Sequence, residues 1–279
     1  MYLQHFGLRE LPFGITPDTS YVFGSRSHRR ALNTLLVALQ LGEGFIKITG
    51  EVGTGKTLLC RRLLGCLPPD TLAAYLPNPA MKPRGLLLAL SQELGLSVSP
   101  RATEFDLRVK LEAAMITQAR AGRRVVVLLD EAQTMTPASL EILRLLSNLE
   151  TEKSKMLQLV LFGQPELDRT LGRPAVRQLR QRIAFSYRMR GMRAEEVAAY
   201  LEHRLQVAGR VGPPVFTADA AQVLHLASQG VPRLVNILAN KSLMVAYGRG
   251  RAEVGATEAN PAGAGDIEAR QQRQQGALA

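Results

Sequence analysis

Five short apolar runs recur along the first two thirds of the chain, at 44–50, 71–77, 124–130, 156–163 and 183–189. Between them, apolar residues follow helical spacing, most clearly over 81–95, 104–121 and 137–150. Strands that alternate with helices are typical of a parallel sheet, and RVVVLLD at 124–130 has the continuous hydrophobicity of a central strand covered on both faces. We therefore predict an α/β fold with a doubly wound parallel sheet.

The pattern changes after Gly191, where apolar residues predict only helices, over 194–208, 217–228 and 232–247. From 249 onward glycine, alanine, glutamine and charged residues dominate without periodicity, which is typical of a disordered tail. We expect four segments: an N-terminal segment leading into the core (1–42), the α/β core (43–190), a small helical domain (191–248) and the tail (249–279).

The sequence GEVGTGKT at 50–57 lies between a predicted strand and a predicted helix. It matches the P-loop pattern G-x-x-x-x-G-K-[ST], in which backbone N–H groups and a helix N-terminus surround phosphates. We expect Lys56 to reach the β- and γ-phosphates of ATP, and the Thr57 hydroxyl to bind Mg²⁺. The predicted ATP-binding residues are Gly50, Glu51, Val52, Gly53, Thr54, Gly55, Lys56, Thr57 and Leu58.

Two acids, Asp130 and Glu131, stand at the carboxyl end of the central predicted strand. Doubly wound sheets bind their ligands at this edge. We predict that Asp130 binds Mg²⁺ through water and that Glu131 polarises the water that attacks ATP. Two surface acids that end a strand are the alternative, which the P-loop upstream disfavours.

Further polar residues occupy positions from which they could contact the nucleotide. Gln164 ends the fourth predicted strand, where its amide could reach the γ-phosphate or the attacking water. Arg180 and Arg182 precede the fifth strand, where one could enter a neighbouring subunit's site as an arginine finger. Arg233, in GVPRLVN, begins a helix and could contact the phosphates. Taken alone, each also fits an ordinary surface residue.

The composition indicates a soluble globular protein, because 46% of the 279 residues are hydrophobic and yet charged residues interrupt the richest runs. We expect no transmembrane segment. The start, MYLQHFGLRELPF, has no basic segment leading into an apolar stretch, so we expect a cytoplasmic protein. The formal net charge of +11 fits nucleic acid, anionic lipid or an acidic protein as a partner.

Together, GEVGTGKT, DEAQ at 130–133, LFGQPEL, LRQRI and GVPRLVN resemble the AAA+ ATPases of the ExeA/GspA type. The opening HFGLRELPFGITPDTSYVFGSRSH also looks like that family's N-terminal signature, so the resemblance runs over residues 1–248. Within the family, the chain most resembles the MshM type, which serves biogenesis of the mannose-sensitive haemagglutinin (MSHA) type IV pilus. The resemblance implies a P-loop AAA+ core, a small C-terminal helical lid domain, and ring-like homo-oligomers with ATP at subunit interfaces.

The resemblance also assigns a role to each residue singled out above. These roles are Walker A for Lys56 and Thr57, Walker B for Asp130 and Glu131, sensor 1 for Gln164, arginine finger for Arg182 or Arg180, and sensor 2 for Arg233. ExeA-like members with a transmembrane segment and a peptidoglycan-binding region carry them after the ATPase core, whereas here a short polar tail follows. That departure favours a cytoplasmic role, peripheral to the inner membrane through a protein partner.

These observations favour an oligomeric ATPase that assists assembly of a type IV (MSHA-like) pilus or a related type II secretion system. The alternative is a DNA-bound regulatory ATPase of the transposition type, whose nucleic-acid contacts would explain the positive charge. Nucleic acid is not favoured, because no appended helix-turn-helix is indicated and only 5% of the residues are aromatic. A nucleotide-dependent scaffold with negligible turnover is a third hypothesis, which requires that Glu131 not act on water.

Overall fold

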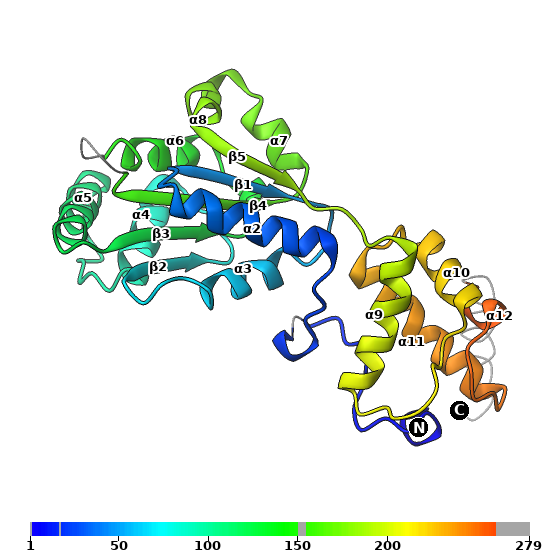
Figure 1. Ribbon diagram of the computed structural model, residues 1–279. Helices are drawn as coiled ribbons and strands as arrows, with labels where there is room; N and C mark the ends of the chain where they lie inside the picture. Colours follow the sequence, from blue (N-terminus) through cyan, green and yellow to red (C-terminus); the bar gives the residue numbers. More distant parts are fainter. Residues whose placement is uncertain (1, 17, 150–154, 261–279) are drawn as a thin grey trace, which may run out of the picture. The chain divides into compact units, whose positions relative to one another are not determined.

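A computed structural model describes residues 2–16, 18–149 and 155–260. It divides the chain into two compact units (Figure 1). We call the described residues of 28–52 and 56–189 the sheet unit, and the described residues of 2–27, 53–55 and 190–260 the helical unit. Each unit encloses hydrophobic core residues of its own.

The sheet unit contains a five-stranded parallel sheet in the order β2-β3-β4-β1-β5. Its strands are β1 (Phe45–Thr49), β2 (Thr71–Leu76), β3 (Arg124–Leu129), β4 (Leu157–Gly163) and β5 (Ile183–Arg188). Each strand lies within one of the five predicted runs, so the predicted parallel α/β sheet is confirmed. Because Thr49 pairs with Gly163 and Leu129 with Leu161, the strands that precede the P-loop and the two acids end at the same edge.

Successive side chains of β3 alternate between two apolar layers, one on each face of the sheet. Val125, Val127 and Leu129 belong to one layer. Its helices are α4 (Pro83–Glu93), α5 (Glu104–Arg120), α6 (Pro137–Leu146), α7 (Glu166–Leu171) and α8 (Arg177–Gln181), with the 3₁₀ turn η3 (Pro174–Val176). Val126 and Leu128 belong to the other layer, with α2 (Arg26–Gln40) and α3 (Lys56–Leu64) (Figure 1). The sheet is therefore doubly wound, as predicted.

Helix α6 begins at Pro137, where the predicted helix over 137–150 also begins. Thr136 Oγ1 accepts a hydrogen bond from Ser139 N at 3.1 Å, and Pro137 takes the first helical position. Only the short segment 130–135, including the 3₁₀ turn η2 (Ala132–Thr134), then connects β3 to α6. This short connection keeps Asp130 and Glu131 at the sheet edge.

The helical unit contains α9 (Ala194–Val207), α10 (Ala218–Ser228) and α11 (Pro232–Gly248), which agree with the three predicted helices. It also contains α1 (Tyr2–His5) and η1 (Thr19–Tyr21) from the N-terminus. The aromatic side chains Phe6, Phe13 and Tyr21 are buried in the same core as residues of α9 and α11. Residues 1–42 thus contribute to both units, because α2 packs on the sheet.

Arg204 of α9 holds the N-terminal segment by polar contacts. Its guanidinium donates to the backbone oxygens of Pro12 at 2.5 Å and Gly14 at 3.4 Å, and its carbon Cζ lies 4.2 Å from the centre of the Tyr21 ring. Asn236 of α11 also donates to Gly14 O, at 2.9 Å. These backbone oxygens are satisfied by side chains, which lets an irregular segment be buried.

Our prediction that a disordered tail begins at residue 249 is wrong for residues 249–260. The backbone of Val254 forms a parallel bridge with Phe216, and its side chain is fully buried. Helix α12 (Ala256–Ala259) follows, and its Glu258 is 2% exposed because Arg249 and Gly255 N donate to its carboxylate. Residues 249–260 therefore fold with the helical unit, and the rest of the predicted tail, 261–279, lies outside the described residues.

Candidate functional site

The P-loop, residues 50–57, joins the end of β1 to the start of α3. Gly50 N donates to Gly163 O at 3.1 Å, which ties the start of the loop to the end of β4. Gly53 and Gly55 adopt positive φ angles of 81° and 89°, which side chains other than glycine rarely tolerate. These two glycines turn the backbone toward the N-terminus of α3, and such a turn is suited to binding an anion.

Lys56 is buried at the first position of α3. Its ammonium donates to the backbone oxygens of Gly50 at 2.8 Å and Glu51 at 3.1 Å. Burial lowers the pKa of Lys56, and the nearby carboxylates of Glu131 and Asp130 oppose that change. A buried ammonium with carbonyl partners gains most from an anionic ligand, so a phosphate group fits this position.

Thr57 and Asp130 connect the P-loop to the end of β3. Thr57 Oγ1 donates to Asp130 Oδ2 at 2.6 Å, and Glu131 N donates to Asp130 Oδ1 at 2.9 Å. Burial raises the pKa of Asp130, and these two hydrogen bonds act in the opposite direction. A hydroxyl and a buried carboxylate in contact are oxygen ligands of the kind that Mg²⁺ prefers, and a cation there would offset the cost of burying the charge.

Glu131 follows at the same edge in a left-handed backbone conformation, with φ 52° and ψ 36°. This conformation is uncommon for a residue with a side chain, and strained residues of this kind cluster at functional sites. Gln164, at the end of β4, donates from Nε2 to Glu131 Oε2 at 3.1 Å. The structure thus brings together Lys56, Thr57, Asp130, Glu131 and Gln164, which the sequence analysis selected from three separate segments.

Gln133 is a polar residue of this site that the sequence analysis did not select. Its Nε2 donates to Glu131 Oε2, and its Oε1 accepts from Gln164 N at 3.0 Å. The signal was present in DEAQ at 130–133, which we used only as part of a family pattern.

Two of the three predicted arginines lie together at α8, and the third lies in α11. Arg180 is in α8 and Arg182 ends it, and both side chains are exposed. Arg182 Nη1 donates to Ser147 Oγ at 3.2 Å. Arg233 is exposed in the first turn of α11, in the helical unit. Their roles toward a nucleotide stay predictions.

Comparison with known proteins identifies the family. Residues 39–171 match the family model of the AAA domain. General secretion pathway protein A of Aeromonas hydrophila is 47% identical to the chain over 253 residues, which are 90% of this chain and 46% of that protein. The chain is an AAA+ protein of the ExeA/GspA type. It spans about half the length of the curated relative that it matches.

Solved structures share the AAA+ fold at low sequence identity. Cdc6p from Pyrobaculum aerophilum has a TM-score of 0.63 at 17% identity, covering 85% of this chain and 68% of that one. The ORC2 protein of Aeropyrum pernix has a TM-score of 0.61 at 17% identity, covering 89% of this chain and 71% of that one. At such identities the likeness concerns the fold alone.

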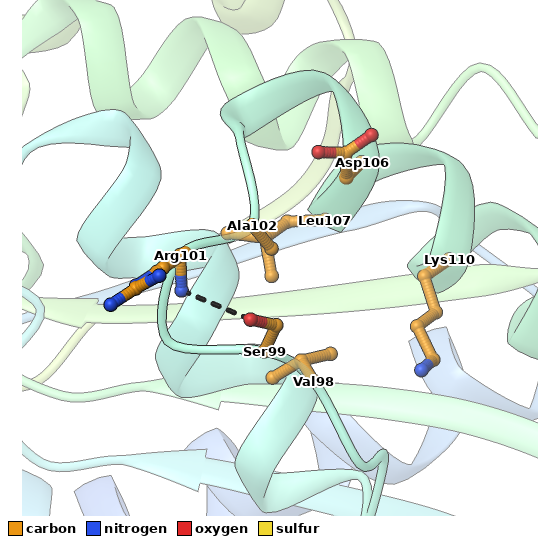
Figure 2. A pocket seen from close by; sticks show the side chains of 7 residues that line it. All are labelled: Val98, Ser99, Arg101, Ala102, Asp106, Leu107 and Lys110. Carbon is orange, nitrogen blue, oxygen red and sulfur yellow. Dashed lines mark hydrogen bonds between the residues drawn. The ribbon is translucent and has the colours of Figure 1, made fainter.

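A pocket of this AAA+ protein lies between the α4–α5 connection and α5 (Figure 2). None of the predicted nucleotide-site residues lines it. Two of its charged groups are engaged locally, since Asp106 accepts from Thr103 at the start of α5 and Lys110 donates to Ser97 O. We therefore place the candidate site at the P-loop and not in this pocket.

Two features are absent from the described residues of this AAA+ protein. Among these residues, no helix is both long and apolar enough to cross a bilayer. The same residues contain no group of three or more histidine, cysteine or acidic side chains arranged to hold a metal ion.

Proposed function

We propose that this AAA+ protein binds ATP with Mg²⁺ at the P-loop and hydrolyses it. The observation that carries the proposal is the 2.6 Å hydrogen bond between Thr57 and Asp130, since it joins the P-loop to the acid that ends β3. In the proposal, Lys56 and the backbone N–H groups of residues 50–58 hold the phosphates, while the Thr57 hydroxyl binds Mg²⁺ and Asp130 binds it through water. Bound Mg²⁺ would supply charge stabilisation at the reacting phosphate.

In this proposal Glu131 orients the attacking water and accepts its proton, as a general base does. The position supports it: Glu131 directly follows the proposed Mg²⁺ ligand Asp130, and Gln164 contacts its carboxylate. Gln164 then serves as the sensor 1 residue, within reach of both the water and the γ-phosphate.

We further propose that the active form is a homo-oligomer with ATP at subunit interfaces. Arg182 or Arg180 acts there as the arginine finger of a neighbouring subunit, and their exposure on α8 supports this role. Arg233 acts as sensor 2, and the helical unit serves as the lid domain. Alanine substitution of each arginine in turn tells the two finger candidates apart.

In the cell, we propose that this ATPase assists assembly of a type II secretion system or a related type IV, MSHA-like pilus. The 47% identity to a general secretion pathway protein supports the first assignment. The protein would act in the cytoplasm, at the inner membrane through a protein partner. The DNA-bound alternative is supported by the net charge of +11.

The proposal predicts different defects for substitutions at Lys56 and Glu131. We expect Lys56→Ala to lose ATP binding, because it removes the buried ammonium that faces the phosphates. We expect Glu131→Gln to bind ATP as the wild type does and to lose about 10²–10⁴-fold in turnover, because an amide cannot accept the proton. Steady-state phosphate release and binding of a fluorescent ATP analogue measure the two effects. Normal turnover by Glu131→Gln would refute the assigned base.

The same preparation separates the two cellular hypotheses. Turnover and sedimentation with ATP are measured at low and moderate salt, with and without duplex DNA. ATP-dependent assembly with turnover indifferent to DNA supports the secretion or pilus role. Strong stimulation by DNA that falls with salt favours the DNA-bound ATPase instead, and leaves the nucleotide site unchanged.

A further inference from the structure

Gln133 makes two hydrogen bonds of opposite direction at the candidate site. Its amide nitrogen donates to Glu131 Oε2, and its amide oxygen accepts from the backbone N–H of Gln164 at 3.0 Å. The side chain therefore bridges the carboxylate that follows β3 to the backbone that follows β4. An uncharged amide side chain can donate to a carboxylate and accept from an N–H at once, whereas a glutamate can only accept.

The bridge restricts a carboxylate whose backbone is already constrained. The φ of 52° at Glu131 is maintained by contacts on both sides, since Glu131 N donates to Asp130 Oδ1 and Glu131 O accepts from Thr134 N at 3.0 Å. Gln133 is the middle residue of η2, the 3₁₀ turn that directly follows Glu131. A short turn thus carries the carboxylate and one of its donors.

Both amide donors reach the same oxygen of Glu131. Gln133 Nε2 and Gln164 Nε2 each donate to Oε2, so among the hydrogen bonds of the described residues Oε1 is the oxygen left for water. Fixing one oxygen fixes the direction of the other. Such orientation of a catalytic group matters, because a misplacement of about 1 Å can cost on the order of 10²-fold in rate.

We propose that Gln133 is a positioning residue that fixes the carboxylate of Glu131 through Oε2 and couples it to the end of β4. This inference rests on the proposed function, since it concerns the residue assigned there as the base. It assigns Gln133 no contact with the nucleotide. Its loss should therefore lower kcat and leave ATP affinity unchanged.

The test compares three variants of the full chain. Gln133→Met keeps the length of the side chain and removes both hydrogen bonds. Gln133→Glu keeps the acceptor for Gln164 N but loses the donor and adds a like charge beside Glu131. Gln206→Met is the matched control, because Gln206 also donates to a glutamate, Glu202 Oε1 at 2.9 Å, but in α9 of the helical unit.

We expect kcat to fall about 10- to 100-fold in Gln133→Met and at least as far in Gln133→Glu. The dissociation constant of a fluorescent ATP analogue and the melting temperature should stay near the wild-type values in both. The control should match the wild type in every measurement. If Gln133 had only a structural role, its substitution would also lower ATP affinity or stability. A loss of kcat alone therefore supports a positioning role.

Each other outcome overturns the inference. An unchanged or raised kcat in Gln133→Met means that the bridge does not orient Glu131 for reaction. Near-normal kcat in Gln133→Glu would mean that Gln133 acts only through its hydrogen bond with the Gln164 backbone. ATP binding that weakens as much as kcat would mean that Gln133 shapes the P-loop instead. If the wild type itself does not turn over ATP, the proposed function fails as well. Wild-type turnover with an inactive Glu131→Gln and a fully active Gln133→Met removes the inference alone.

Discussion

The sheet unit and the helical unit both bury charged side chains, but they use them differently. In the sheet unit, Lys56 is 5% exposed and its ammonium donates hydrogen bonds to two backbone carbonyl oxygens of its own loop. In the helical unit, Arg204 is 8% exposed and donates to two backbone oxygens and a tyrosine hydroxyl. A buried charge that joins distant segments of the chain therefore indicates architecture, whereas a buried charge held only by carbonyls of its own P-loop, which a ligand could replace, indicates chemistry.

The two sites also differ in where their residues come from. The sheet unit's polar residues follow the ends of neighbouring parallel strands, so the chain places them at one edge without long detours. The helical unit's polar contacts join sequence-distant parts, such as Arg204 of α9 and Pro12 near the N-terminus. Polar substitutions in the sheet unit should therefore change activity first, and those in the helical unit should change stability first.

The largest expected effect is at Asp130. We expect Asp130→Asn to lose at least about 10²-fold in turnover, because the amide is a poor ligand for Mg²⁺. Burial raises the pKa of Asp130, which means that its charged form is unfavourable in the folded protein without a cation. The variant should therefore melt higher than the wild type in the absence of nucleotide. Phosphate release and thermal unfolding measure the two changes.

Asp106→Asn is the control for the lower turnover and higher melting temperature expected of Asp130→Asn. Asp106 caps α5 in the same unit, and hydrogen bonds from Thr103 lower its pKa, so neutralising it should not raise the melting temperature. Its turnover should be normal. A lower melting temperature in Asp130→Asn would mean that this carboxylate stabilises the fold, and the comparison between the units would then fail at its central residue.

Local patterns explain why the sheet unit could be predicted. Strand β3 is a continuous apolar run because both of its faces are covered, and the P-loop is a contiguous motif between a strand and a helix. The helix start at Thr136 was equally local, because the cap and its partner are three residues apart. Gln133 was not predicted as a site residue, because its two partners follow different strands and only the folded sheet brings them together.

The helical unit was harder to predict, because its decisive contacts are not local. Nothing in the sequence near Pro12 shows that Arg204 will meet its carbonyl. The polar stretch after 249 has no periodicity, and yet Val254 and Glu258 each find a buried position. A short segment anchored by single residues leaves no repeating pattern, so composition alone suggested disorder.

The next largest effect is on stability, at Arg204. We expect Arg204→Met to destabilise the helical unit by about 2–4 kcal/mol, because the carbonyls of Pro12 and Gly14 lose their donor while the apolar volume is kept. Hydrogen exchange should then rise over residues 2–23 and α9. Protection of the β1, β3 and β4 amides should stay as in the wild type.

The matched control is Arg108→Met in α5, where an arginine likewise lies over an aromatic ring but has an acid as its polar partner. Its partners are Glu112 at 3.8 Å and the Phe105 ring at 5.8 Å, on an exposed helix face. Exposed pairs of this kind contribute only about 0–1 kcal/mol. If Arg108→Met lowered the free energy of unfolding as much as Arg204→Met, the buried contacts of Arg204 with the N-terminal segment would not explain its effect on stability.

The smallest expected effect is at Glu258, and it depends on pH. Burial alone would raise the pKa of Glu258, but hydrogen bonds from Arg249 and Gly255 N outweigh it, so the pKa lies below its ordinary value of 4.5. A carboxyl whose pKa is lower in the folded than in the unfolded chain stabilises the fold above pH 4.5 and loses that contribution as pH falls through the folded value.

Hydrogen exchange of residues 254–260, corrected for its intrinsic pH dependence, should therefore rise as pH falls below 4.5 in the wild type. Glu258→Gln should show a higher, pH-independent exchange there, equivalent to about 1 kcal/mol, because an amide gives Arg249 a weaker acceptor. Equal exchange in the two proteins at neutral pH would show that Val254 and its backbone bridge hold this segment without the carboxylate.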